Sequence, residues 1–181
     1  MRHNWPALLL ALVTGCAPRA NDADSAAVYE SLLVDHCCLD RVILQEVTDT
    51  AGLSDGRRWS DEEEMRGFSP EVRQAVDDLS RASRTVHRLP ATLRVTPRDR
   101  RLPADSVRAI LRQVQRNGLH RFPGRETIVL ISGVGFSDDR KLAVVRMTEV
   151  CGSLCGGTTV RALRRHPAGW IPAEAVFQAV F

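Results

Sequence analysis

The 181-residue sequence predicts an α+β fold: two or three helices packed on a C-terminal antiparallel β-sheet of three to four strands. Two observations lead to this prediction. Between Glu126 and Pro172, apolar and β-branched runs alternate with short polar or glycine-rich turns, which is typical of antiparallel hairpins. Upstream of them, apolar residues recur at helical spacing in several segments. The length and the hydrophobic fraction of 44% are those of one ordinary globular domain.

The first 15 residues are predicted to be a lipoprotein signal peptide. A basic start at Arg2 and His3 precedes the apolar run Ala7–Val13, which is far shorter than the roughly 20 residues that span a bilayer. The run ends in Val13–Thr14–Gly15–Cys16, which resembles the bacterial lipobox. That resemblance implies cleavage before Cys16, diacylglycerol on its sulfur and an acyl chain such as palmitate on its new amine. The alternative is an ordinary secretory signal with an incidental cysteine.

Residues 16–25 are small and polar, and are predicted to form a flexible tether to a single domain over residues 26–181. Ala17, in place of an aspartate after Cys16, favours the outer membrane over the inner membrane of the cell envelope. Nucleic acid is not an expected partner, because the formal charge is only +3 and the arginines alternate with acidic residues.

The middle of the chain contains three predicted helices. Ala26–Asp35 has near-helical apolar spacing, with Ser25 as a possible N-cap. Ser69–Pro70 opens the second helix, since serine caps well and proline is tolerated in the first turn. Pro103–Asn117 is the third, stopped by Gly118. The inward positions of the last two are Val72, Ala75, Val76 and Leu79, and Val107, Ile110, Leu111 and Val114.

Strands are predicted by β-branched composition and by turns. Arg41–Thr48 is an early strand, and Thr92–Val95 is a short candidate. The C-terminal sheet is expected to contain Ile128–Phe136, Lys141–Cys151, Thr158–Arg165 and a strand that begins at Trp170–Ile171. Ala173–Phe181 fits either a helix or a strand. Gly133 and Gly135 inside the first of these strands indicate a bulge or the close approach of another backbone.

Two cysteines flank the central turn, Cys151–Gly152–Ser153–Leu154–Cys155. Across a hairpin, opposed Cα atoms lie about 4.5–5.5 Å apart, which is within reach of a disulfide. An exported protein also resides where disulfides persist. A Cys151–Cys155 bond is therefore predicted. The pairing of Cys37 and Cys38 stays open between a bond to each other and a bond to the hairpin.

Several C-terminal segments occur in a distinctive order: Phe122–Pro123–Gly124, Ile131–Ser137, Leu142–Val145, Cys151–Gly157 and Trp170. This order resembles a family of uncharacterised bacterial envelope proteins, whose pattern reads roughly S-R-V-G-F, A-L-V-Y-V, C-G-x-L-C-G-x-G and G-x-W. Gly133 replaces the usual arginine, and Arg146–Met147 departs from the usual aromatic end of the strand. The resemblance implies an α+β fold and an exported protein, often a lipoprotein. It implies no catalytic residue.

The sequence contains no recognisable catalytic constellation. Gly133–Val134–Gly135 lacks the third glycine of a dinucleotide loop, and Ser137 does not sit in a nucleophile elbow. His36 and the cysteines are residue types that suit zinc, but their spacing is not C-x₂-C and export favours disulfides. No cofactor, metal or catalytic residue is therefore predicted.

The predicted function is that of a lipid-anchored cell-envelope module that binds another envelope protein or a cell-wall component without catalysis. The alternative is a periplasmic hydrolase with a dispersed site, which predicts a concave pocket where polar side chains such as His120, Ser137, Asp138 or Glu149 converge.

Overall fold

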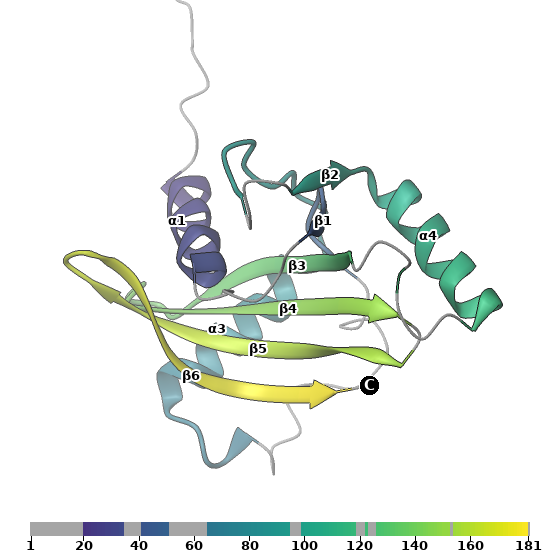
Figure 1. The fold of residues 1–181 in the computed structure, drawn as a ribbon. Coiled ribbons are helices and arrows are strands. Elements are labelled where there is room, and N and C mark those ends of the chain that lie inside the picture. The colour runs from purple at the N-terminus through teal and green to yellow at the C-terminus, as the bar shows by residue number, and fades with distance from the viewer. Residues whose placement is uncertain are drawn as a thin grey trace, which may run out of the picture.

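The computed structural model describes residues 20–34, 41–50, 65–94, 99–118, 122, 126–152 and 154–180 (Figure 1). Three helices lie within these ranges: α1 (Ala20–Val34), α3 (Pro70–Ala82) and α4 (Ala104–Asn117). The described strands are β1 (Val42–Gln45), β2 (Arg100–Leu102), β3 (Thr127–Phe136), β4 (Leu142–Gly152), β5 (Cys155–His166) and β6 (Gly169–Val180). None of the helices in these ranges has the length and the apolar composition of a membrane-spanning segment.

The α+β class is confirmed, but the sheet is larger than the predicted three to four strands. The described strands form one sheet in the order β2-β1-β3-β4-β5-β6. Strands β3 to β6 are an antiparallel meander, as expected, whereas β1 is parallel to both β2 and β3. A parallel pair joins segments far apart in sequence, here Val42 with Thr127, and needs a long crossover, which here contains α3 and α4.

The β-rich elements differ from the predictions in three places. Strand β2 was not predicted, because its sequence Arg100–Arg101–Leu102 lacks the β-branched residues that mark strands. The candidate strand at Thr92–Val95 was wrong in its described part, since Ala91 and Thr92 form a turn. The ambiguous C-terminal segment is a strand, since β6 continues from Gly169 to Val180.

The helix signals at α3 and α4 are confirmed. The Oγ atom of Ser69 accepts a hydrogen bond from the backbone N–H of Val72, and Pro70 is the first helical residue. Gly118 ends α4 in the left-handed conformation, with φ of 60°. Helix α1 was predicted from Ala26, but it begins at Ala20 and so takes in the last part of the segment assigned to the tether.

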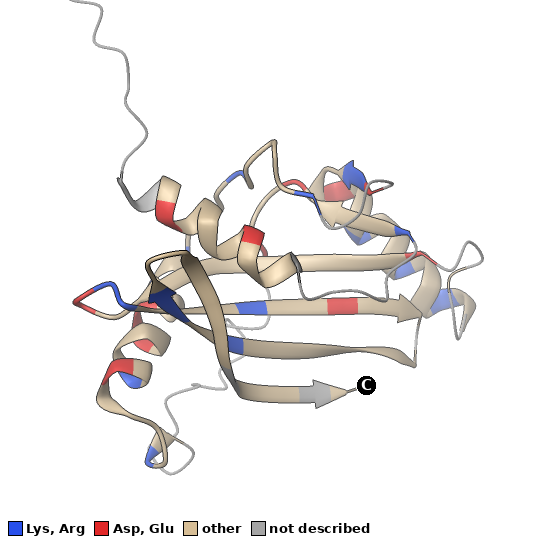
Figure 2. Cartoon of the chain, turned by 60° about the vertical axis from the view of Figure 1, so that its left-hand side comes forward, with Lys and Arg blue, Asp and Glu red and all other residues tan. Residues whose placement is uncertain are grey.

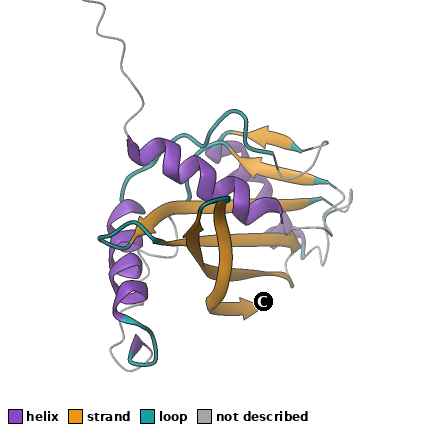
Figure 3. Ribbon diagram, turned by 90° about the vertical axis from the view of Figure 1, so that its left-hand side faces the viewer, coloured by secondary structure: helices purple, strands orange, loops and turns teal. Residues whose placement is uncertain are grey.

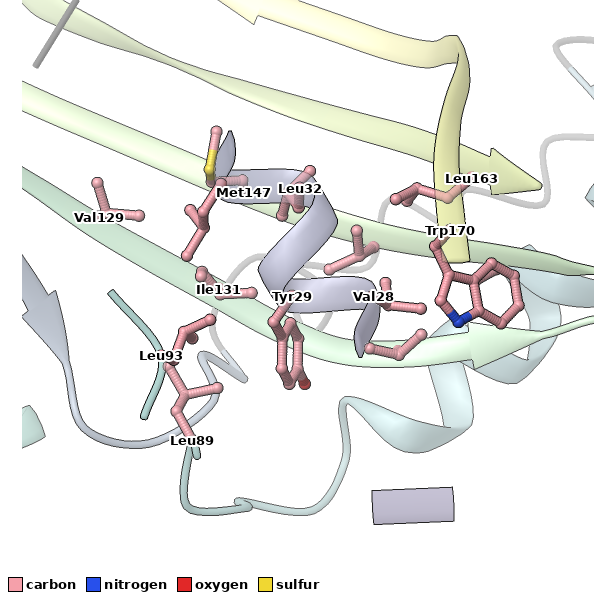
Figure 4. Packing of buried hydrophobic residues seen from close by; sticks show 14 of the residues in the cluster. Val28, Tyr29, Leu32, Leu89, Leu93, Val129, Ile131, Met147, Leu163 and Trp170 are labelled. Atoms are coloured by element: carbon pink, nitrogen blue, oxygen red, sulfur yellow. The ribbon is translucent and has the colours of Figure 1, made fainter. Parts of the chain in front are cut away.

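Helix α1 covers one face of the sheet, and Figure 4 shows this packing at close range. Val28, Tyr29 and Leu32 project from the helix onto β3, β4 and β5. Alternate residues of β4, namely Ala143, Val145 and Met147, belong to this cluster, which confirms the predicted alternation. Leu89 and Leu93 close it beside Tyr29, and Trp170 of β6 closes it at the other side.

Helices α3 and α4 cover the opposite face (Figures 1 and 3). The buried stripe of α3 is the predicted one, and it packs on Leu142 and Val144 of β4 and on Val160 and Ala162 of β5. Val107 and Val114 of α4 pack on Ile43 and Ile128, whose neighbours along β1 and β3 face α1. The sheet is therefore buried on both faces where these helices lie.

The two glycines of β3 have the roles that the sequence indicated. Ile131 pairs with Met147 and Val134 with Val145, so Ser132 and Gly133 together oppose Arg146 as a β-bulge. At Gly135, a Cβ atom would lie 2.1 Å from the backbone oxygen of Ala75, so only glycine lets α3 pack this closely on β3.

Arg146 is a buried charged residue on the α3 and α4 face of the sheet. Its Nη2 atom lies 2.8 Å from Oδ2 of Asp49, and the two side chains are 4% and 12% exposed. Its backbone N–H donates to Ser132 Oγ at 2.9 Å, which stabilises the bulge. Because a buried charge without a partner is costly, this pair constrains how residues 47–50 lie against the sheet.

Candidate functional site

A pocket of about 700 Å³ opens between α1, the end of α3, the segment that follows α3, and β3. We call it the α1 pocket. Its lining is drawn from sequence segments that are far apart: Ala23, Ser25, Ala26, Tyr29, Asp78, Arg81, Ala82, His87, Arg88, Pro90, Gly133, Val134, Phe136 and Arg140. A volume of this size is within the range of about 300–1,000 Å³ that is usual for small-molecule sites.

The floor of the α1 pocket is buried, and its rim is exposed. Tyr29, Val134 and Phe136 are buried, whereas Arg81 and Arg88 on the rim are exposed. The lining includes three arginines and one aspartate, a formal surplus of two positive charges with His87 neutral. The pocket therefore combines an apolar floor with a cationic rim. Elsewhere on the chain, basic and acidic positions are mixed along helices and turns (Figure 2).

Two polar side chains of the pocket hydrogen bond to the backbone of β3. The Tyr29 hydroxyl donates to the carbonyl oxygen of Ser132 at 3.0 Å, and Oδ2 of Asp78 accepts from the Phe136 N–H at 2.9 Å. Strand β1 pairs with β3 only as far as Val129, so these side chains satisfy backbone groups beyond the end of β1. Burial also raises the pKa of the Tyr29 phenol well above its usual value, so it remains a neutral donor.

A cluster that we call the Asp24 clasp (Asp24, Arg140 and Arg165) lies beside the pocket. Arg140 donates from Nε and Nη2 to Oδ2 of Asp24 at 3.1 and 2.9 Å, and Nη2 of Arg165 lies 3.4 Å from Oδ1. Both guanidiniums also lie over aromatic rings, Arg140 at 4.1 Å from the centre of Phe136 and Arg165 at 5.7 Å from that of Trp170. The clasp ties the start of α1 to the β3–β4 turn and to the end of β5.

Arg140 adopts a backbone conformation that is uncommon for its residue type. Its φ angle of 55° lies in the left-handed region, where non-glycine residues are strained. Such strain persists only where surrounding contacts offset it. In Arg140, the ion pair with Asp24 and the contact with the Phe136 ring offset the strain.

The opposite end of the β4 and β5 hairpin is the hairpin tip, residues 151–155. The predicted Cys151–Cys155 disulfide is present, with Cα atoms 5.1 Å apart. The two cysteines do not oppose each other as expected, because Gly152 pairs with Cys155 and the register shifts before it. Cys151 is thus at an irregularity of the strand. Leu154 is 70% exposed at the tip.

Of the residues named for a dispersed hydrolase site, the three that the structure describes are not brought together in one place. The Ser137 hydroxyl is buried in the β3–β4 turn, where it donates to Asp139 and accepts from the Leu142 N–H. Asp138 is at the same turn and accepts from Gln74. Glu149 is seven positions along β4 from Leu142, or roughly 24 Å of extended strand. His120 lies outside the described residues.

Three further predicted site residues also lie outside the described residues: Cys16, the lipid-attachment candidate, and Cys37 and Cys38. Within the described ranges, no group of three or more histidine, cysteine or acidic residues is placed to bind a metal. The rim residues Arg81, His87, Arg88 and Arg140 were missed. They come from separate segments without a shared motif, and only tertiary packing brings them to one pocket.

Comparison with known proteins identifies no relative from which a function can be transferred: no family model, no curated protein and no solved structure matches the chain.

Proposed function

We propose that this chain is a lipid-anchored protein of the bacterial cell envelope, held in the outer membrane through Cys16, and that it acts as a non-enzymatic binding module. The observation that carries the proposal is the α1 pocket, whose cationic rim and apolar floor lie beside the start of the helix that follows the anchor. Such a combination suits an anionic ligand with an apolar part.

The spacing between anchor and pocket supports this arrangement. Only residues 17–19 separate Cys16 from the first residue of α1, Ala20. Four residue steps span at most about 14 Å when fully extended. A lipid on Cys16 therefore keeps the start of α1 close to the membrane surface, and the pocket residues Ala23, Ser25 and Ala26 follow within the next two turns.

Binding fits the pocket better than catalysis does. Tyr29 and Asp78 are the groups near the floor that could transfer a proton, and both are occupied by hydrogen bonds to β3. The exposed rim groups Arg81, Arg88 and His87 suit an anionic ligand. Among the described candidates for the hydrolase alternative, Ser137 and Asp138 lie at the β3–β4 turn and Glu149 lies far along β4, which supports that alternative less well than binding.

The anchor is tested by intact-mass spectrometry of the chain expressed in a bacterium that processes lipoproteins. Wild type is expected to gain the mass of a diacylglycerol and an acyl chain on Cys16 and to sediment with membranes. Cys16→Ser is expected to carry no lipid. Wild type with no added lipid mass would contradict the anchor.

Binding is tested separately, with the lipidated chain in detergent, by titration with amphiphiles of either charge and thermal-shift readout. Anionic amphiphiles are expected to raise the melting temperature more than cationic ones of equal chain length. The charge reversal Arg88→Glu is expected to remove that difference. Equal shifts with both charges would contradict a cationic binding pocket.

A further inference from the structure

We propose that the α1 pocket binds the phosphate headgroup of an anionic phospholipid in the same membrane that holds the anchor. This inference rests on the proposed function, since the anchor brings the pocket to the membrane surface. It adds the chemical class of the ligand and gives the domain a defined orientation on the bilayer.

Two rim arginines are available to a phosphate. Arg81 is 69% exposed and its ion pair with Asp78, at 3.1 Å, is solvent-accessible, so exchanging this partner for a phosphate costs little. The side chain of Arg88 is exposed and makes no hydrogen bond or ion pair with any described residue. A guanidinium presents several N–H donors in a planar fork that matches phosphate oxygens.

A half-buried arginine that contacts a lining residue, Arg101, adds to the positive potential of the pocket. Nη1 of Arg101 donates to the carbonyl oxygen of Pro90, a lining residue, at 2.8 Å. Its Nε and Nη2 atoms are buried and have no hydrogen-bond partner among the residues that the structure describes. Burial, and then the nearby charge of Arg94, lower the pKa of this guanidinium, while Arg88 is close enough to interact with it. The carboxylates of Asp99 and Glu46 offset part of this charge, and the remainder favours an anion at the adjacent rim.

The floor of the pocket matches the rest of a phospholipid headgroup region. Ala82, Val134 and Phe136 offer apolar contact to the glycerol and to the first acyl carbons below a phosphate held at the rim. Arg140 is less available, because it is engaged by Asp24 and Phe136. An arginine at an anionic membrane surface contributes about fivefold to affinity, so Arg81 and Arg88 together predict an effect of about 25-fold.

The experiment compares the lipidated mature protein, which begins at Cys16, in nanodiscs of phosphatidylcholine alone and in nanodiscs that also contain phosphatidylglycerol. Hydrogen–deuterium exchange is measured over residues 83–90 and over the hairpin tip. We expect slower exchange of residues 83–90 in the anionic discs and no change at the tip. The double variant Arg81→Glu/Arg88→Glu is expected to remove the slowing. Equal exchange in the two discs, or slowing that persists in the double variant, would overturn the proposal.

A matched control and a competing ligand sharpen the result. Arg73→Glu makes the same charge change at an exposed position of α3 outside the pocket lining, and should leave the slowing intact. Loss of the slowing in this control would mean that overall charge is responsible, and would overturn a specific site. Inorganic phosphate added to the phosphatidylcholine discs should have little effect. Equal slowing by phosphate would assign the pocket to a soluble anion instead of a lipid.

A failed anchor is distinguishable from a failed pocket. If mass spectrometry finds no lipid on Cys16, the Cys16→Ser chain is mixed with phosphatidylglycerol vesicles and sedimented. The proposed headgroup site predicts binding to these vesicles at least about 25-fold tighter than that of the Arg81→Glu/Arg88→Glu variant of the same chain, because each substitution removes a positive charge and adds a negative one. Equal sedimentation of the two chains would overturn the headgroup site on its own, whatever the state of the anchor.

Discussion

The two ends of the sheet are secured in opposite ways. At the end that carries the α1 pocket, the Asp24 clasp joins residues 116 positions apart in sequence. At the hairpin tip, a disulfide joins residues only four positions apart. The first end is held by non-covalent contacts between distant segments, and the second by a local covalent bond.

Because of this difference, substitutions at the two ends are expected to affect stability in different ways. Contacts between distant segments form only when the whole domain folds, so a change at the pocket end is expected to alter the global free energy of unfolding. The disulfide links neighbours within one hairpin, so its loss is expected to act mainly on the tip. The α1 pocket, which is built from α1, α3 and β3, is therefore expected to be sensitive to packing in distant segments, whereas the disulfide constrains the tip, where Leu154 is exposed.

The largest effect is expected at Gly135, where the pocket end depends on a close approach of α3. In Gly135→Ala the new Cβ would lie 2.1 Å from Ala75 O and 2.2 Å from Leu79 N, so the helix must move away from β3. Because overpacking typically costs about 1–3 kcal/mol and these contacts are with backbone, we expect a loss of about 3 kcal/mol or more. Urea denaturation measures it.

Gly67→Ala is the matched control for this substitution, because nothing lies within 4 Å of a Cβ at that position. It should change the free energy of unfolding by less than about 1 kcal/mol. If Gly135→Ala were as stable as this control, the packing of α3 on β3 would not depend on the glycine.

The second prediction concerns the hairpin tip. Removing the disulfide in Cys151→Ser/Cys155→Ser returns loop entropy to the unfolded chain, and for so short a loop the loss is at most about 2 kcal/mol. Amide exchange should accelerate at residues 150–157 and stay unchanged over residues 78–90. Faster exchange at the pocket end would show that the two ends are coupled, and would contradict the expectation that the disulfide acts mainly on the tip.

A smaller effect is expected from Asp24→Asn. The substitution keeps the size of the side chain but leaves Arg140 and Arg165 without their carboxylate. These pairs are partly exposed, with side-chain exposures of 33% and 51% for the arginines, so we expect a loss of only about 1 kcal/mol. Thermal denaturation should show this loss at low salt and less of it at high salt, because salt screens exposed charges. The same loss at every salt concentration would argue for packing instead of charge.

The sequence predicted the elements whose signals are local. Ser69 and Pro70 mark the start of α3 because capping needs only adjacent residues, and Gly135 marks a close approach because only glycine lacks a Cβ. The disulfide could be predicted because the two cysteines flank one turn. The bulge that offsets Cys151 from Cys155 could not be predicted in this way. These features depend on the chain within a few residues.

What could not be predicted depends on tertiary contacts. Strand β1 was expected, but its parallel pairing with β3 joins Val42 to Thr127, and no window of sequence contains both. The rim of the pocket is similar, since Arg81, Arg88 and Arg140 resemble any surface arginine until α3, the following segment and the β3–β4 turn converge. Two of the candidate hydrolase residues have a local structural role instead. Ser137 and Asp138 are polar because a tight turn needs them, and not because of a site.

The last prediction uses Tyr29, the chain's single tyrosine, to monitor the pocket end alone. Burial raises its pKa in the folded protein above the usual value near 10, so the unfolded chain releases the proton more readily. The folded state is therefore fully stable, as far as Tyr29 is concerned, below pH 10, where the phenol is neutral in both states. Its free energy of unfolding declines as the pH rises above 10, because the unfolded chain then loses the phenol proton. Absorbance of tyrosinate should appear together with unfolding and above pH 10. Asp24→Asn should lower that pH, because it weakens the same end, whereas Cys151→Ser/Cys155→Ser should leave it nearly unchanged. A titration near pH 10 in the folded wild type would mean that the phenol is open to solvent and that the floor of the pocket is not closed.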